Sequence, residues 1–476
     1  MEKILLINPP TGNYIRDDRC QAPVKYVAIL RMPMDLAYMA ATLKQIGIIC
    51  KIKDYPAEKG TIMSFRNDLQ EFNPNALVVS TTTPTILKDL KIISLAKKIL
   101  PNIITIAKGA HVTVKDKEVL EKCPELDIVI RNECELAIQD IAGELNKKNP
   151  SLKKITGITF RNKNNIIRNP DRKPLENLDL LPFPARELIK NELYIRPDTK
   201  KPQTTIQTNR GCPGACTFCL VKVVSGNKIL SRSPINIADE IEECIEKFNI
   251  RDFYFRADTF TWDKDWMISV CKEILKRKLK INWCSNSRVN TLDEERIKWM
   301  KKSGCWMLGL GIESGNQEIL KKMKKGITLK QIEEAVRLCK KHKIKIFAFF
   351  VIGYPEDTKE TIMDTIKFAK KLNCDFTEFN TCYPYPGTEI YKLGKDKLFS
   401  DEKLYGKDQY GASIPSFSLS AEEITLLRDK AEKEFILRPE YIIKTLANIS
   451  SLREFFSYLK FGIIWFKEKM SQNKTN

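Results

Sequence analysis

The chain has 476 residues, too many for one ordinary hydrophobic core, so we expect two or three domains. Its 80 lysines and arginines outnumber its 60 aspartates and glutamates, which gives a formal net charge of +20. The lysines are spread over nearly every predicted helix, so this charge indicates a solvated basic surface rather than a nucleic-acid-binding face. No run reaches the roughly 18 apolar residues of a membrane-spanning helix, and the first residues do not resemble a signal peptide. We therefore expect a cytoplasmic protein.

Over residues 1–150, short apolar runs alternate with stretches that show helical periodicity. Strands are predicted at 3–8, 50–55, 76–81, 102–107 and 127–131, and helices at 33–47, 85–100, 115–123 and 134–148. Such alternation is typical of a parallel sheet with helices on both faces, in which ligands bind beyond the carboxyl ends of the strands. The sequence therefore predicts an N-terminal α/β domain of the Rossmann type.

The strand-helix alternation stops in residues 151–200. These residues contain a predicted hairpin and an extended stretch interrupted by prolines, LENLDLLPFPAREL. We interpret this part as a connecting segment. The alternation resumes in residues 201–400, where strands are predicted at 204–209, 252–258, 281–287, 306–314, 345–353 and 375–381. Six strand-helix units predict a partial (β/α)6 barrel, with functional residues at the carboxyl ends of its strands.

Residues 401–476 lack strand patterns and predict a C-terminal helical region. Ser420 and Glu423 form a plausible capping box at the start of a helix over 420–437. The stretch 451–470 carries an apolar stripe, which consists of Leu452, Phe455, Phe456, Leu459, Ile463 and Phe466. We expect this stripe to dock on the preceding domain, and peripheral contact with a membrane is the alternative.

The sequence has 14 cysteines, and three of them are clustered: Cys212, Cys216 and Cys219 form a C-x3-C-x2-C array. The others are scattered and are expected to be small buried apolar residues. A structural zinc site needs four ligands, but no fourth cysteine or histidine lies at a suitable spacing, and a redox C-x-x-C pair would leave Cys212 without a role. Three thiolates on one loop can instead bind three irons of a four-iron cluster, so that the fourth iron is open to substrate.

The array and four later segments resemble the radical S-adenosylmethionine superfamily. These segments are WCSNSRVNTLDEERIKWMKKSGC, GLGIESGNQEILKKMKKGIT, FFVIGYPEDTKETIMDTIKFAKKL and YPYPGTEIY. The resemblance implies that Cys212, Cys216 and Cys219 hold a 4Fe-4S cluster, whose open iron is chelated by the amino and carboxylate groups of S-adenosylmethionine. One electron then cleaves the sulfonium, and a 5'-deoxyadenosyl radical abstracts hydrogen from an unactivated carbon.

The same resemblance implies residues that contact S-adenosylmethionine, at positions that match the family's motifs. They are Phe218, Asp258, Ser285, Asn286, Arg288, Glu313 and Gly353, with Pro355 shaping the loop after Gly353. One departure is Ala257, which stands where the family often has a second acid.

The order of the segments resembles the branch of this superfamily whose first domain binds cobalamin, which includes the anaerobic magnesium-protoporphyrin ester cyclase and the radical methylases of hopanoids and natural products. PMDLAYMAATLKQIG, GAHVT, LENLDLLPFPAREL and FILRPEYI carry this resemblance. It implies that the cofactor lies beside the strand-end residues Ser80, Thr81, Thr82, Gly109 and His111. The chain departs from the branch by lacking a D-x-H-x-x-G loop, by Lys108 in place of the first of two glycines, and by Asn132 and Cys134 in place of smaller residues.

The resemblance implies a cobalamin-dependent radical enzyme, a methyltransferase or cyclase, that acts on a small or lipid-like molecule and takes electrons from a donor such as flavodoxin or ferredoxin. The apolar residues Phe455, Phe461 and Trp465 favour a lipid-like substrate. One alternative is RNA modification by a methylthiotransferase-like enzyme without cobalamin, but the three extra N-terminal cysteines of such enzymes are not evident. Another alternative is a binding protein that keeps the cluster without catalysis.

Overall fold

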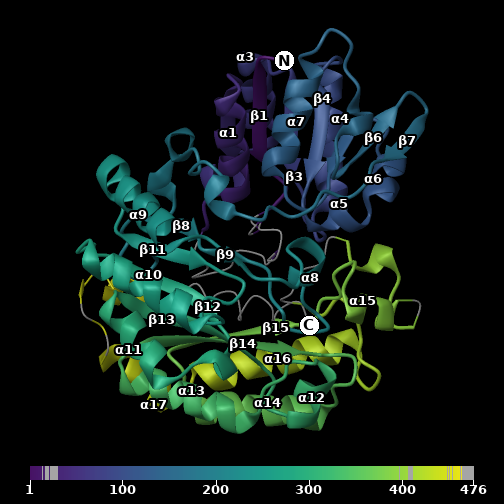
Figure 1. Cartoon of the computed structure of the whole chain (residues 1–476). Coiled ribbons are helices and arrows are strands. Elements are labelled where there is room, and N and C mark those ends of the chain that lie inside the picture. Colours follow the sequence, from purple (N-terminus) through teal and green to yellow (C-terminus); the bar gives the residue numbers. More distant parts are fainter. Residues whose placement is uncertain are drawn as a thin grey trace.

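The computed structural model describes residues 1–12, 14, 16, 21, 30–395, 397–405, 411–447, 449, 451–452, 454–460 and 462–463. Figure 1 shows an N-terminal α/β domain packed against the mouth of a second α/β domain, with the C-terminal helices on the outside of the second domain. The predicted fold class, a Rossmann-like domain followed by a partial barrel and a helical region, is confirmed.

The N-terminal sheet has the strand order β2-β1-β3-β4-β5-β6-β7. Five strands are parallel: β1 (Lys3–Asn8), β2 (Ile49–Asp54), β3 (Ala76–Ser80), β4 (Ile104–Lys108) and β5 (Ile128–Ile130). In β1, Ile4 and Leu6 pack under α1 (Met34–Gln45) and α7 (Glu135–Leu145), whereas Leu5 and Ile7 pack under helices of the opposite face. Both faces of the strand are buried, which is why its sequence is a continuous apolar run.

The opposite face is covered by α3 (Ile62–Phe72), α4 (Ile86–Ile99) and α6 (Asp116–Lys122), and the short helices α2 (Tyr55–Glu58) and α5 (Ala110–Val114) follow β2 and β4. All four helices predicted for this domain are present. The sequence analysis missed α3, whose only fully buried apolar side chains are Phe65 and Leu69. The third buried residue is the polar Asp68, which interrupts the apolar face that periodicity would reveal.

The predicted hairpin is formed by β6 (Ile158–Asn162) and β7 (Asn165–Arg168), and it extends the N-terminal sheet. β6 pairs antiparallel with β5, with Phe160 opposite Ile128. The remaining connecting residues form the 3-10 turns η1 (Leu152–Lys154), η2 (Leu178–Leu180), η3 (Arg186–Leu188) and η4 (Asn191–Leu193). Two further 3-10 turns, η5 (Val289–Thr291) and η6 (Asp401–Lys403), lie later in the chain.

The second sheet is wholly parallel, in the order β15-β14-β13-β12-β11-β8. Its strands are β8 (Gln203–Gln207), β11 (Asp252–Arg256), β12 (Asn282–Ser287), β13 (Cys305–Glu313), β14 (Lys345–Ile352) and β15 (Phe376–Thr381). Its helices are α9 (Pro234–Phe248), α10 (Lys264–Lys276), α11 (Glu294–Lys302), α12 (Gln317–Lys322), α13 (Leu329–Lys341) and α14 (Lys359–Leu372). The six predicted strands are confirmed, and β8 and β15 form the two unpaired edges of a partial barrel.

Helices in the C-terminal region cover the β15 side of this barrel. They are α16 (Ala421–Ile436) and α17 (Pro439–Ala447), whereas α15 (Glu389–Gly394) lies near the barrel mouth, where Tyr391 packs in one apolar cluster with Leu220. The predicted capping box at Ser420 and Glu423 is present, and Ile424 and Phe435 of α16 pack into the barrel's outer core. None of the helices built from the described residues is long and apolar enough to cross a membrane.

The apolar stripe after α17 does not dock as predicted. Leu452 is 78% exposed, Phe456 61% and Ile463 48%, while Phe466 lies outside the described residues. The neighbouring face of the same segment is the one that contacts the barrel, because the carboxylate of Glu454 is buried and lies 3.7 Å from the ammonium of Lys345. The docking prediction is therefore wrong for most of the stripe.

Candidate active site

The three clustered cysteines lie on one loop between β9 (Asn209–Arg210) and α8 (Val221–Val224), at the mouth of the barrel. β9 pairs with β10 (Leu230–Ser231), and this pairing closes the segment that contains the loop and α8. Gly211 has φ +85, and a Cβ there would lie 2.0 Å from the carbonyl oxygen of Lys228. Only glycine allows the chain to turn this close to the returning strand.

The thiols of Cys212, Cys216 and Cys219 differ from the others in exposure. Ten further cysteines are described and all are buried, as predicted, whereas these three are partly exposed. Among the described residues, no group of three or more Cys, His, Asp or Glu side chains converges on a single metal ion. A four-iron cluster does not require such convergence, because each thiolate binds a different iron.

Hydrogen-bond donors surround the sulfur atoms. The backbone N–H of Gly214 donates to the Cys212 sulfur at 3.4 Å, and the guanidinium of Arg288 donates to the Cys216 sulfur at 3.4 Å. Burial raises the pKa of the free Cys219 thiol to about 12, and the neighbouring Cys216 adds to this rise. Since iron binds the thiolate, cluster formation would supply the positive charge that this thiolate needs. These donors and the partial exposure fit a 4Fe-4S cluster.

Asp258, Ser285 and Asn286 lie at the ends of β11 and β12 but point in different directions. Asp258 accepts the backbone N–H of Gly211 at 2.6 Å, so it holds the start of the cysteine loop. Ser285 is 1% exposed, and its hydroxyl donates to the carbonyl of Phe255 on the neighbouring strand. Asn286 faces the barrel interior, where Gly309 leaves room for its amide. The structure therefore brings Asp258 and Asn286 to the predicted site and leaves Ser285 within the sheet.

Glu313 forms a buried ion pair with Lys325, a residue that the sequence analysis did not single out. Their charged atoms are 2.6 Å apart, and the two side chains are 9% and 7% exposed. A Cβ at Gly311 would lie 2.5 Å from the carboxylate of Glu313 and 2.7 Å from the ammonium of Lys325, so this glycine makes the pair possible. Burial lowers the pKa of Lys325, but Glu313 and Cys216 raise it by more, so Lys325 stays charged.

Arg288 connects this pair to the cluster loop, because one of its guanidinium nitrogens reaches the Cys216 sulfur and another donates to the carbonyl of Lys325. Phe218 packs against an apolar group that includes Met323 and Tyr354. Gly353 has φ +79, and a Cβ there would lie 2.5 Å from Ile424 of α16. Cationic groups thus gather on the side of the cysteine loop that faces β12 and β13, where an amino-acid carboxylate would be stabilised.

The five residues predicted to lie beside cobalamin meet at the carboxyl ends of β3 and β4. The hydroxyl of Thr81 donates to the carbonyl of Lys108 at 2.9 Å, and Ser80 and Thr82 are buried beside it. Gly109 has φ +131, and its missing Cβ would lie 2.4 Å from the carbonyl oxygen of Thr81.

His111 follows on α5, where burial lowers its pKa to about 4 and keeps the imidazole neutral. Its Nδ1 lies 3.3 Å from the hydroxyl of Thr83, and the ring of Tyr405 makes an edge contact with it. The side chain of Lys108 points toward α1, where its ammonium pairs with Asp35 at 2.6 Å. The hydroxyls and the neutral imidazole at this strand edge can form hydrogen bonds with the amide groups on the rim of a corrin.

Two contacts join the carboxyl ends of β3 and β4 to the cysteine loop. Ala110 of the N-terminal domain packs in one apolar cluster with Leu220 and Val224, which directly follow the loop. Arg210, which directly precedes the loop, pairs with Glu133 at 3.1 Å and with Glu135, both from the N-terminal domain. In Figure 1, α5 and α8 accordingly face each other across the boundary between the domains.

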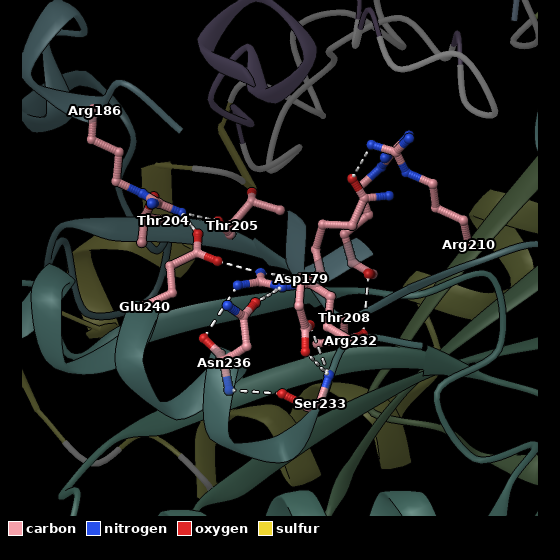
Figure 2. A network of polar contacts seen from close by, with 12 residues as sticks. Asp179, Arg186, Thr204, Thr205, Thr208, Arg210, Arg232, Ser233, Asn236 and Glu240 are labelled. Atoms are coloured by element: carbon pink, nitrogen blue, oxygen red, sulfur yellow. Dashed lines mark hydrogen bonds and ion pairs between the residues drawn. The ribbon is translucent and has the colours of Figure 1, made fainter. Parts of the chain in front are cut away.

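Arg210 also ends a buried polar network that crosses the barrel's first strands (Figure 2). Arg186 of the connecting segment and Arg232 both pair with Glu240 of α9, and all three are at most 3% exposed. Arg232 donates to the carbonyl of Gln207, whose side chain in turn accepts from Arg210 at 3.0 Å. The network ties the connecting segment, the barrel and the cysteine loop to one another.

Replacing Arg210 by Met is expected to loosen the two domains from each other. The buried carboxylate of Glu135 and the partly exposed one of Glu133 would lose their cation, at a cost of about 3–5 kcal/mol. Calorimetry of the wild type should show one unfolding transition, whereas the variant should show an earlier transition for the N-terminal domain. The double variant R210M/E135Q should recover part of the loss, and equal unfolding of the two variants would contradict the pairing.

Comparisons with known proteins agree with the division of the chain into two α/β domains. The family model described as "Radical SAM superfamily" matches residues 206–369, which contain the cysteine loop and the four central barrel strands β11 to β14, and the model described as "B12 binding domain" matches residues 31–142. A protein of Pyrococcus horikoshii, named an uncharacterized methyltransferase, PH0819, is 31% identical over 449 residues, which are 93% of this chain and 94% of that protein. The chain is a member of the radical SAM superfamily.

Two further similarities extend over most of the chain. The anaerobic magnesium-protoporphyrin IX monomethyl ester cyclase of Rubrivivax gelatinosus is 27% identical over 410 residues, which are 85% of this chain and 73% of the cyclase. The solved structure of the radical S-adenosylmethionine methyltransferase TsrM from Kitasatospora setae, with cobalamin and a [4Fe-4S] cluster bound, superimposes with a TM-score of 0.67. That likeness covers 92% of this chain and 82% of TsrM at 16% identity, so it shows a shared fold.

Membership in the superfamily, together with the B12-binding domain, makes this radical SAM protein an enzyme with three cofactors. They are a 4Fe-4S cluster, S-adenosylmethionine and cobalamin. The cofactor predictions from the sequence are thereby confirmed, and the roles of individual residues remain predictions. Lys325, Glu133 and Glu135 were missed, although the run KKGIT and the acidic residues after β5 mark these positions in the sequence.

Proposed function

We propose that this radical SAM enzyme is a cobalamin-dependent methyltransferase that acts on an unactivated carbon of a small or lipid-like molecule. The observation that carries the proposal is the packing of the strand edge with Gly109 and His111 against the helix that follows Cys219. It brings the B12-binding domain next to the cluster loop. The relative in Pyrococcus horikoshii and TsrM are both named methyltransferases, which supports the same reaction class.

Each group of residues has a defined task in this proposal. When bound, the cluster with S-adenosylmethionine supplies a 5'-deoxyadenosyl radical and cobalamin supplies the methyl group. Cys212, Cys216 and Cys219 hold the cluster at the barrel mouth, and Arg288 and Lys325 offer positive charge to a carboxylate beside it. The apolar contact between α5 and α8 keeps water away from the space between the two domains.

Cyclisation is the second candidate, since the cyclase of Rubrivivax gelatinosus is similar over 85% of this chain. Both reactions begin with hydrogen abstraction from carbon, and they differ in product. A methyltransferase adds one CH2 to the mass of its substrate and consumes a second S-adenosylmethionine, whereas a cyclase adds no methyl group.

Partners and location follow from the cofactors. We infer a low-potential electron donor such as flavodoxin or ferredoxin, and a reducing cytoplasmic compartment, because a thiolate-ligated cluster with an open iron needs both. The basic charge is spread over the surface, so we infer no nucleic-acid partner. The exposed residues Leu452, Phe456 and Ile463 favour peripheral contact of the C-terminal segment with a membrane surface.

The test is anaerobic purification with cobalamin supplied, followed by spectroscopy and reduction. We expect cluster and corrin absorbance together, and formation of 5'-deoxyadenosine and S-adenosylhomocysteine when S-adenosylmethionine and dithionite are added. Protein prepared without cobalamin should still form 5'-deoxyadenosine but should no longer form S-adenosylhomocysteine. A cluster spectrum without corrin would overturn the methyltransferase proposal, and protein that fails to cleave S-adenosylmethionine would overturn the radical chemistry as well.

A further inference from the structure

The C-terminal segment covers the end of the barrel that lies opposite the cysteine loop, where the amino ends of its parallel strands meet. The hydroxyl of Tyr441 in α17 donates to the carbonyl of Asp375, one residue before β15, and Lys444 pairs with the Asp375 carboxylate at 3.1 Å. The buried carboxylate of Glu454 lies 3.7 Å from the ammonium of Lys345, the first residue of β14. These contacts hold the segment at the amino end of the barrel, and Figure 1 shows α17 on the side remote from the N-terminal domain.

The outward face of this segment is apolar and uncovered by the described residues. Six of its side chains are each at least 48% exposed, and we call them the apolar face: Ile443, Leu446, Leu452, Phe456, Leu459 and Ile463. The last four recur at spacings of four, three and four residues, so on a helix they share one side. Single exposed apolar residues are common on protein surfaces, but a group of this size marks an interaction surface.

Exposed cationic side chains stand at the same end of the barrel. The chain just before β8, β11, β12, β13 and β14 carries at least one each, and together they form a basic rim: Lys200, Arg251, Lys278, Lys280, Lys302 and Lys343. The acidic side chains that lie among them are engaged in ion pairs. Asp198 and Asp252 pair with Arg196, and Asp375 pairs with Lys444. The rim is therefore positively charged.

Local structure does not explain the lysines of the basic rim. Lys200, Lys278 and Lys343 have φ of +56°, +56° and +54°, a left-handed conformation in which glycine is favoured over lysine. Helix dipoles favour cations in the last turn of a helix, but these three residues lie outside helices. Their side chains thus add charge to this surface at positions where the backbone does not favour them.

An apolar face beside a basic rim fits the surface of an anionic lipid bilayer. The aliphatic side chains can enter the boundary of the acyl region while the lysines reach the phosphate headgroups. Nucleic acid would fit the lysines but not the aliphatic side chains, because base stacking needs aromatic rings. A second copy of this chain on the same face would bring two positively charged rims together.

We propose that the amino end of the barrel, with its apolar face and basic rim, docks on an anionic lipid surface. The inference rests on the peripheral membrane contact in the proposed function and adds the docking face, the lipid charge and the orientation to it. The cysteine loop and the N-terminal domain lie at the other end of the barrel. Docking therefore leaves the barrel mouth directed away from the bilayer and involves none of the residues assigned to the cofactors.

The test is flotation of the full-length anaerobic holoenzyme with vesicles of phosphatidylcholine alone or in equal mixture with phosphatidylglycerol. We expect binding to the mixed vesicles that weakens at high salt, and little binding to phosphatidylcholine alone. In the lysine double variant, Lys278→Gln with Lys280→Gln, affinity for mixed vesicles should fall by roughly 25-fold, since each lysine near an anionic surface contributes roughly fivefold. In the apolar double variant, Leu452→Ser with Phe456→Ser, affinity should fall by at least roughly tenfold, because two inserted side chains are lost.

The matched control is Lys153→Gln with Lys154→Gln, which removes the same charge from an exposed turn of the N-terminal domain. This control should bind the mixed vesicles as the wild type does. Wild-type enzyme that does not float with the mixed vesicles would overturn the inference, as would equal affinity of the lysine double variant and the control. A dimer that the apolar double variant dissociates, or salt-dependent RNA binding, in either case without vesicle binding, would also overturn it.

Cluster and corrin absorbance and cleavage of S-adenosylmethionine are measured on the same preparations, and all variants should match the wild type in them. Enzyme that cleaves S-adenosylmethionine but does not bind the mixed vesicles would overturn the inference and leave the radical chemistry standing. Enzyme that binds the vesicles but does not cleave S-adenosylmethionine would overturn the proposed reaction and leave the docking face standing. The two failures are therefore distinguishable.

Discussion

Replacing Cys212, Cys216 or Cys219 by Ala is expected to abolish both the cluster and the cleavage of S-adenosylmethionine. Each thiolate would hold one iron, and the fourth iron, which has no protein ligand, is the one available for chelation by S-adenosylmethionine. A cluster with only two protein ligands is not retained, so each single variant should lose the whole activity. Iron and sulfide analysis after anaerobic reconstitution, with chromatography for 5'-deoxyadenosine, measures both effects.

The matched control is Cys50→Ala, which removes a buried thiol from β2 of the N-terminal domain. This variant should keep full iron content and full cleavage, with a small loss of stability from the cavity. If any of the three loop variants still cleaved S-adenosylmethionine, the assignment of these cysteines as cluster ligands would be refuted.

Replacing Lys325 by Met is expected to destabilise the barrel by about 3–5 kcal/mol, because the Glu313 carboxylate would be buried without its cation. Burial lowers the pKa of Lys325 but the neighbouring Glu313 raises it by more, so the loss should be full at neutral pH and should shrink as the pH rises above the ordinary pKa of a lysine. We also expect weaker binding of S-adenosylmethionine, since a positive charge next to Cys216 is lost. Urea unfolding at two pH values and equilibrium dialysis measure these effects.

The neighbouring residue offers a matched control. Lys324 pairs with Glu389 on the surface, where both side chains are more than half exposed. Such a pair contributes about 0–1 kcal/mol, so Lys324→Met should leave stability and cofactor binding nearly unchanged. In the double variant K325M/E313Q the buried charge is gone and most of the stability should return. If K325M alone were as stable as the wild type, Glu313 would not depend on Lys325.

The elements with strong periodicity were predictable because each contains its own signal. The continuous apolar runs at 3–8 and 76–81 became β1 and β3, since both faces of these strands are buried. Helix α3 was missed, because the polar Asp68 is buried beside Phe65 and Leu69 and interrupts the apolar face. The stripe at 451–470 was wrongly predicted to dock on the preceding domain. Its periodicity indicates an apolar face, but it does not indicate what covers that face.

The sequence by itself determined the two sheets, the three cysteines on one loop, and the family with its cofactors, because strand alternation and short motifs are local and need no knowledge of distant contacts. Only the tertiary structure decided which groups meet at the site. Lys325 reaches Glu313 because Gly311 leaves space for both, and Arg210 meets Glu133 and Glu135 across two domains. These features arise from packing between residues far apart in the chain, which no local pattern encodes.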